Sequence, residues 1–281
     1  GYTLATTKTT NDSITYLADK TYDGLDLIVK SSLNNVKNFV FNDNSTYTLT
    51  TDLSDITGTE FNVLGQEIDG VISTIDFGSH NAFKLNGANT LNIQNTKLTN
   101  AKDNLAIDMS TARTGAELNL DNTIIDGDIK SYQFATININ GDTEFTGTIS
   151  GADVILNDGT LSMAQDTFRN SNGLNATAGR ISLDNGTVEN YVISNLQSSE
   201  DVRYSLDLDL ASKTADTIKA DSTSSKGTVT LDNVNFLNDY DGEGEFTVQV
   251  IDAHNSNLQL ALDENLNNYY IKDISRIEQD I

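Results

Sequence analysis

Pairs of aliphatic residues two positions apart recur along the chain, and a polar corner of Asn, Asp or Gly follows each pair. The stretch "LNIQNTKLTN" (residues 91–100) returns in altered form as "LNLDNTIIDG" from residue 118, "ISLDNGTVEN" from residue 181 and "VTLDNVNFLN" from residue 229. Two apolar residues at i and i+2 point to the same side of a β-strand. The polar residues that follow tolerate left-handed backbone angles and end the strand. Each phrase therefore predicts a strand, a corner and the start of another strand.

The second aliphatic residue of each phrase serves as an anchor for alignment. Most anchors are followed five positions later by another apolar residue, which predicts that the next strand faces the same interior. The anchors are Ile93, Leu120, Ile139, Leu156, Leu183 and Leu231, with Leu208 between the last two and Phe41, Val63 and Leu85 upstream. Apart from the eight residues between Leu85 and Ile93, they recur about every 17–27 residues, an interval typical of a solenoid whose coils differ in their loops. We expect the anchors to stack in one column.

Short strands with no helical periodicity predict an all-β fold, and their repetition favours a β-helix of about ten coils. Stacked Asn side chains at the corners can hydrogen-bond from one coil to the next. The chain has no Pro, which suits a backbone that donates to its neighbours in every coil. A propeller would need blades of ~40–50 residues with their own signatures, and a sandwich would not reuse one corner phrase.

The repeat pattern suggests one continuous domain, because no linker rich in Gly, Ser or Pro interrupts it. Residues 1–38 are less regular, and we expect them to form an N-terminal cap that covers the exposed strand edges of the solenoid. Residues 39–262 are predicted to form the body of the β-helix. Residues 263–281 are predicted to form a C-terminal extension.

The charge of the chain excludes several kinds of partner. Its 281 residues include 17 Lys and Arg against 41 Asp and Glu, which gives a formal net charge of −24. No basic cluster is present to bind nucleic acid or an anionic lipid surface. No apolar run approaches the ~18–20 residues that a membrane helix needs, so we expect no membrane insertion by this stretch of chain.

Cysteine is absent, whereas Asn occurs 33 times. The absence of Cys excludes disulfides, thiolate metal sites and a Cys nucleophile. It is common in exported bacterial surface proteins, where an early disulfide would obstruct secretion of an unfolded chain. The composition therefore favours an extracellular or cell-surface location.

Residues 73–101, the repeated "LDNGT" and "LDNV" corners and residues 204–253 carry a family resemblance. They are similar to passenger regions of Gram-negative autotransporters and related repeat-rich surface adhesins. The resemblance covers roughly residues 60–262 and is one of repeat style. It implies a right-handed parallel β-helix of the pectate-lyase-like superfold, displayed outside the cell.

Parallel β-helices also include carbohydrate-active enzymes, so a polysaccharide lyase or glycoside hydrolase is the alternative. The nearest fragments of a polygalacturonase-like site are "NTK" (95–97) and "GSH" (78–80), without the adjacent Asp pair or the Arg-Ile-Lys motif. His80 and His254 lie far apart in sequence and are expected to be solvent-facing corner residues. The five arginines are scattered among different phrases: Arg113, Arg169, Arg180, Arg203 and Arg276.

The acidic stretch "DYDGEGE" (239–245) resembles half of a calcium loop, with carboxylates at alternate positions and Gly allowing a sharp turn. Its candidate calcium ligands are Asp239, Asp241 and Glu243. Val250 occupies the position where an EF-hand loop would place its bidentate Glu, so an acidic surface hairpin remains open as the simpler interpretation. The alternating Asp207 and Asp209 are expected to face solvent.

These observations favour a non-enzymatic β-helical passenger that acts as a stalk and adhesin at the bacterial surface. Its loops, especially the insertions at 99–117 and 162–180, would contact a host glycan, a host protein or a sister chain. A calcium-stabilised structural repeat is a third interpretation. No catalytic residue and no cofactor other than calcium is predicted.

Overall fold

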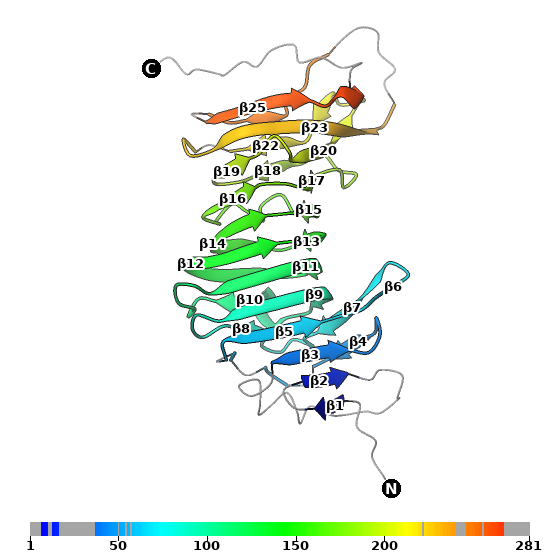
Figure 1. Cartoon of the computed structure of the whole chain (residues 1–281). Helices are drawn as coiled ribbons and strands as arrows, with labels where there is room; N and C mark the ends of the chain where they lie inside the picture. The colour runs from blue at the N-terminus through cyan, green and yellow to red at the C-terminus, as the bar shows by residue number, and fades with distance from the viewer. Residues whose placement is uncertain are drawn as a thin grey trace.

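The computed structural model describes residues 7–10, 13–16, 37–49, 51–53, 55–56, 58–220, 222–239, 246–254 and 256–266. Their regular structure is β-strand apart from two short 3-10 helices, η1 (Lys102–Asn104) and η2 (Glu264–Leu266). Figure 1 shows the strands piled along the long axis of the molecule, from β2 (Ser13–Tyr16) near one end to β25 (Asn257–Leu262) near the other. The prediction of an all-β chain is therefore confirmed.

Most strand pairs are parallel and join segments that are distant in sequence. Twenty-two of the described strands form one hydrogen-bonded sheet, and three form another. Paired residues of parallel strands lie between 17 residues apart (Thr136 and Asp153) and 33 residues apart (Ile218 and Ile251). The antiparallel pairs among the described strands are β1 (Thr7–Thr10) with β2, β6 (Glu67–Ile68) with β7 (Val71–Asp76), and β20 (Arg203–Asp209) with β21 (Thr214–Ala215). Such a parallel arrangement is consistent with a β-helix.

The first stack of parallel strands holds the opening half of several repeated phrases. It comprises β3 (Asn38–Phe41), β5 (Glu60–Leu64), the first halves of β9 (Thr90–Thr99) and β11 (Glu117–Ile125), the ends of β12 (Asp128–Ile139) and β14 (Ile149–Leu156), β16 (Gly173–Ala176), β19 (Leu196–Ser198), the start of β23 (Lys226–Leu237) and β25.

The second stack follows the corner that ends each of these segments. It comprises β4 (Thr46–Thr48), β7, the second halves of β9 and β11, β13 (Thr143–Phe145), β15 (Thr160–Met163), β17 (Arg180–Ser182), β20 and the rest of β23.

A third group of strands lies, along the chain, between a strand of the second stack and the next strand of the first. It comprises β8 (Phe83–Lys84), β10 (Leu105–Met109), the starts of β12 and β14, and the separate sheet of β18 (Asn190–Val192), β22 (Thr217–Lys219) and β24 (Ile251–Asp252). Apolar side chains from all three groups fill one interior cluster.

The predicted aliphatic columns are present in the middle of the first stack. One column contains Leu91, Leu118, Ile137 and Val154, and the next contains Ile93, Leu120, Ile139 and Leu156. Every one of these side chains is at most 1% exposed. Full burial of an aliphatic side chain contributes about 1.5–3 kcal/mol, so these columns are a main source of stability.

The predicted alignment of the later phrases is wrong. Leu156 lies opposite Ala176 rather than Leu183. Ile181 lies opposite Tyr204, which in turn lies opposite Leu231, so the phrases at 181 and 229 belong to the second stack. The same strand and polar-residue pattern occurs in both stacks, and the phrase alone does not say which stack it occupies.

Three further anchors are also out of register. Phe39 rather than Phe41 lies opposite Val63 in the first stack. Leu85 pairs with Ile56 beside β8, in the third group. Leu208 lies opposite Phe236, not beside Leu231.

Asn residues at the corner between the first two stacks behave as predicted. Asn95 and Asn122 adopt left-handed backbone angles, with φ of 48° and 49°. Asn122 Nδ2 donates to Asn95 Oδ1 at 2.8 Å. Directly after the corner, the buried hydroxyls of Thr96 and Thr123 donate to the carbonyls two residues before them, which satisfies polar groups that burial would otherwise leave unpaired.

A second Asn ladder, which the sequence analysis missed, runs up the outward side of the first stack. Each amide donates from Nδ2 to Oδ1 of the preceding Asn, over distances of 2.7–2.9 Å. Its members are Asn38, Asn62, Asn92, Asn119 and Asn138. Ile155 occupies the next position and ends the ladder, because it has no polar group.

The predicted terminal segments lie largely outside the described residues. Within the proposed cap, β2 pairs parallel with β3 and antiparallel with β1. Within the proposed C-terminal extension, η2 follows β25 directly, and Leu266 is buried.

Candidate functional site

The proposed calcium loop lies mostly outside the described residues. Asp239 is an exposed residue after β23, whereas Asp241 and Glu243 are not among the residues described. The calcium interpretation therefore stays a prediction. In the described part of the chain, no three acidic or His side chains converge closely enough to hold a metal ion.

The two histidines lie beside different carboxylates. His80 Nδ1 is 3.5 Å from Asp52 Oδ1, and the side chain of His80 is 33% exposed. His254 Nδ1 is 3.1 Å from Asp252 Oδ1, and its side chain is 43% exposed. They occupy partly exposed positions at separate points of the chain, which agrees with the expected surface placement.

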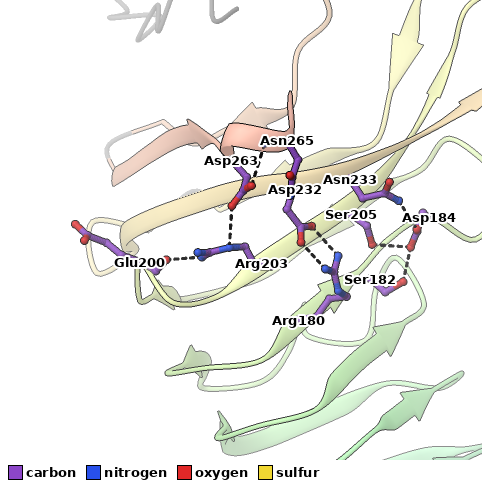
Figure 2. A network of polar contacts seen from close by, with 10 residues as sticks. All are labelled: Arg180, Ser182, Asp184, Glu200, Arg203, Ser205, Asp232, Asn233, Asp263 and Asn265. Carbon is purple, nitrogen blue, oxygen red and sulfur yellow. Dashed lines mark hydrogen bonds and ion pairs between the residues drawn. The ribbon is translucent and has the colours of Figure 1, made fainter. Parts of the chain in front are cut away.

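Two arginines form ion pairs on the outward side of the second stack (Figure 2). Arg180 and Arg203 are neighbours in register. Arg180 binds the Asp232 carboxylate through both terminal nitrogens, and this bidentate contact raises the pKa of Arg180 above its usual value. Arg203 Nε lies 3.4 Å from Asp263 Oδ2, and its Nη1 donates to the carbonyl of Glu200 at 2.7 Å. Both guanidinium groups thus have protein partners, which leaves them poorly placed to bind an anionic ligand.

Asp184 is the centre of the hydroxyl cluster in the same view (Figure 2). Its Oδ1 accepts hydrogen bonds from the hydroxyls of Ser182 and Ser205, and Asn233 Nδ2 lies 3.4 Å from its Oδ2. Partial burial opposes ionisation, but these donors outweigh it and hold the pKa of Asp184 below its ordinary value. Asp184 is therefore an ionised structural acceptor rather than a proton donor.

Two fully buried carboxylates lie where residues 183–191 cover β20. Asp207 Oδ2 accepts hydrogen bonds from the backbone N–H groups of Gly186 and Thr187, at 2.6 and 3.0 Å. Asp216 Oδ1 accepts from the N–H of Glu189 at 2.7 Å. The expectation that Asp207 faces solvent is wrong, because the loop before β18 covers it.

The environment of Asp216 favours its protonated form. Burial raises its pKa to about 7 against the opposing effect of two backbone donors, and the charges of Asp207 and Glu189 add to the rise. Burial also raises the pKa of Tyr191, whose hydroxyl donates to the carbonyl of Leu183. These groups bind a surface loop to the strands beneath it, and their burial leaves no access for a substrate.

A different set of residues forms an open groove on the outward side of the first stack. This amide groove has a volume of about 370 Å³, within the range of small-molecule sites. It crosses β14, β16 and β19, with Ile155 in its lining. Its polar lining residues are Asp153, Asn172, Asn175, Asn195, Gln197 and Ser224.

Hydrogen bonds from side-chain amides to backbone carbonyls fix one edge of the amide groove. Asn195 Nδ2 donates to the carbonyl of Asn172 at 2.6 Å, and Asn172 Nδ2 donates to the carbonyl of Gly151 at 3.1 Å. A side chain at Gly173 would meet the Asn195 carbonyl oxygen at 2.8 Å, so glycine permits the close approach of the two strands there. Asn172 and Asn195 thus position the groove.

An exposed aromatic pair lies beside this groove. Between the pairs Lys130–Ser150 and Ala135–Ala152, four residues of β12 oppose the single residue Gly151 of β14. The resulting bulge carries Tyr132 and Phe134, which are 55% and 53% exposed and have ring centroids 5.5 Å apart.

Of the two segments predicted to contact a ligand, one contributes to the groove and the other does not. Residues 162–180 contribute Asn172 and Asn175 to the amide groove. Residues 99–117 form η1 and β10 of the third group rather than a simple insertion. Sequence reasoning missed the groove because its position depends on the register of β14, β16 and β19. One usable signal was present, namely the replacement of Asn by Ile155 in the ladder.

Comparisons with protein-family models, with characterised proteins and with solved structures find no match to this chain. In the described residues no helix is both long and apolar enough to cross a membrane.

Proposed function

We propose that this chain is the β-helical passenger region of a bacterial surface protein, and that it works without catalysis as a stalk and adhesin. The strands would form a right-handed parallel β-helix of about ten coils with the pectate-lyase-like architecture. Parallel strand connections are right-handed in about 98% of known cases, which supports the handedness. At ~4.8 Å per strand spacing, ten coils would extend roughly 50 Å.

The observation that carries the proposal is the combination of a long parallel stack with an open groove on its side. A solenoid presents an extended surface whose length grows with each repeat, and such surfaces are commonly used for binding. The amide groove and the pair Tyr132 and Phe134 give this surface a place for a ligand. The absence of Cys and the net charge of −24 support an exported, soluble surface.

A carbohydrate-active enzyme is the alternative, and Asp216 is the observation that would favour it. A carboxyl group with a pKa of about 7 resembles a general acid. However, Asp207 and Asp216 are both 0% exposed, and backbone N–H groups together with the side-chain amide of Asn235 occupy their oxygens. This burial supports a structural role and weakens the case for an enzyme.

Adhesion can be tested with beads coated with the purified chain. We expect these beads to attach to an epithelial monolayer or to immobilised mucin, collagen or fibronectin more than albumin-coated beads do. Attachment equal to that of the albumin control on all four surfaces would contradict the adhesin role. Release of products from a polysaccharide panel would favour the enzyme, and a melting temperature lowered by EDTA would favour the calcium-stabilised repeat.

A further inference from the structure

We infer that the amide groove, with the bulge that carries Tyr132 and Phe134, binds a neutral oligosaccharide. The inference rests on the proposed adhesin function for its biological setting and names the ligand class of that function.

Among the described residues, Asp153, Asn175 and Gln197 in the groove lack the side-chain hydrogen bonds that the Asn ladder makes below them. Asn138 and the four Asn below it in the ladder bond to one another. Asn175 and Gln197 continue the same outward column beyond Ile155, yet their amides make no hydrogen bond to any described residue. The same holds for the carboxylate of Asp153, within the described part of the chain.

These free groups match the chemistry of a sugar. Each amide offers two N–H donors and a carbonyl acceptor, and a sugar hydroxyl can pair with both kinds of group. Asn175 and Gln197 lie on neighbouring strands of one stack, so their spacing of ~4.8 Å is fixed by the backbone. A rigid, repeated set of amides suits a ligand with hydroxyl groups along its length.

The aromatic pair lies beside the groove. Thr136 lies opposite Asp153, and Phe134, two residues before Thr136, is exposed and in ring contact with the exposed Tyr132. Phe134 directly precedes Ala135, which pairs with Ala152, the residue before Asp153 in the groove. Exposed aromatic faces provide large apolar contact area, which suits the C–H face of a pyranose ring.

Charge argues for an uncharged ligand. Asp153 contributes a carboxylate to the groove, and the chain as a whole carries −24. Lys226 pairs with Gln197 on the neighbouring strand β23 and places one positive charge next to the groove. Uronates, sulfated sugars and phosphates would therefore meet net repulsion.

The size and polarity of the groove favour an oligosaccharide over a protein partner. The strands β14, β16 and β19, with Ser224 beyond them, span roughly 14 Å at the usual strand spacing, the length of a short oligosaccharide. Stable protein interfaces bury an apolar core within about 800 Å² per partner. The amide groove is much smaller than such an interface and has a polar side chain on each of the three strands that it crosses.

The test uses the purified chain and hexasaccharides of defined composition. Cellohexaose, xylohexaose, mannohexaose and the hexamer of N-acetylglucosamine are the neutral probes, and hexagalacturonate is the anionic control. Isothermal titration calorimetry measures binding. In NMR spectra, the side-chain amide signals of Asn175 and Gln197, assigned by their loss in Asn175→Ala and Gln197→Ala, are expected to shift on titration with the neutral probe that binds.

Matched variants separate the groove from general surface effects. Replacing both Tyr132 and Phe134 by Ala, or both Asn175 and Gln197 by Ala, is expected to weaken binding of the neutral probe at least tenfold. Phe236→Ala and Gln165→Ala remove an exposed aromatic ring and an exposed amide at positions that do not line the groove. They are expected to leave binding within twofold of the unsubstituted chain.

Three results would overturn the inference: no binding of any neutral hexasaccharide, tighter binding of hexagalacturonate, or binding that both double variants retain. Beads that attach to cells equally well with either double variant would support adhesion through another surface, and would overturn only the groove. Sugar binding that depends on the groove, without any bead attachment, would overturn only the adhesin role.

Discussion

The backbone N–H of Asp207 donates a 2.7 Å hydrogen bond to Oδ2 of Asp216, and neither carboxylate is exposed to solvent. The loop of residues 183–191 closes over this pair, since Gly186 and Thr187 donate to Asp207 and Glu189 donates to Asp216. Burying two neighbouring carboxylates disfavours the state in which both are charged. The loop is therefore coupled to the protonation of Asp216.

Asp216→Asn should make stability less dependent on pH between about pH 4 and 7. The pKa of Asp216 is about 7 in the folded chain and about 3.9 when unfolded, so its protonated form stabilises the fold below pH 4. This contribution is lost as the pH rises through 7, with a slope of at most about 1.4 kcal/mol per pH unit. Asn cannot ionise, and thermal unfolding across this pH range should reveal the flatter dependence.

Asp201→Asn is the control for this change, because Asp201 is an exposed residue just before β20. We expect its pH profile to run parallel to that of the unsubstituted chain. An Asp216→Asn profile that also runs parallel would show that Asp216 does not retain its proton in the folded state.

The sequence pattern was sufficient for the strands but not for their assignment to stacks. Leu91, Leu118 and Ile137 could be aligned because their phrases occupy consecutive strands of the first stack. Ile181 could not be placed correctly, because the corner after it uses the same polar residues as the corner after Leu156. Only pairing across the stack shows that Ile181 lies opposite Tyr204.

The burial of Asp207 and the position of the amide groove were missed because both depend on contacts between segments distant in sequence. The alternation around Asp207 correctly indicated a strand, but a loop distant from that strand buries the side chain that alternation placed outward. The amide groove required knowledge that Asn175 continues the column of Asn138 and Ile155. This relation joins three segments of the chain and leaves no local pattern in any one of them.

Asn92→Ala should destabilise the chain, whereas Asn175→Ala should not. Asn92 donates to Asn62 at 2.7 Å and accepts from Asn119 at 2.8 Å, so its loss breaks two hydrogen bonds of the ladder. We expect a decrease of about 1–2 kcal/mol in the free energy of unfolding for two partly buried bonds. Asn175 bonds to no described side chain, so its change should stay within about 0.5 kcal/mol. Urea unfolding measures both, and equal effects would contradict a stabilising ladder.

Leu118→Ala should destabilise the chain by about 2–5 kcal/mol, the usual cost of a cavity at a buried Leu. Leu118 is 0% exposed and lies between Leu91 and Ile137 in the first stack. Val71→Ala is the comparison, because Val71 is 56% exposed on the β6–β7 hairpin. Urea unfolding should show little change for Val71→Ala, and a similarly small change for Leu118→Ala would mean that this column is not closely packed.

Gly159→Ala should be far more destabilising than Gly70→Ala, although both glycines have almost the same backbone angle. Their φ values are 80° and 77°, so an Ala side chain adds similar left-handed strain at each, about 1 kcal/mol. A Cβ at Gly70 meets nothing within 4 Å, whereas one at Gly159 would lie 2.3 Å from the carbonyl carbon of Gly141 in the neighbouring strand connection. Backbone must then move apart, and we expect a total loss of at least about 3 kcal/mol at Gly159. Because the backbone strain is similar at both glycines, the difference between the urea midpoints of the two variants measures the steric clash at Gly159. Indistinguishable midpoints would mean that Gly159 is not packed closely against Gly141.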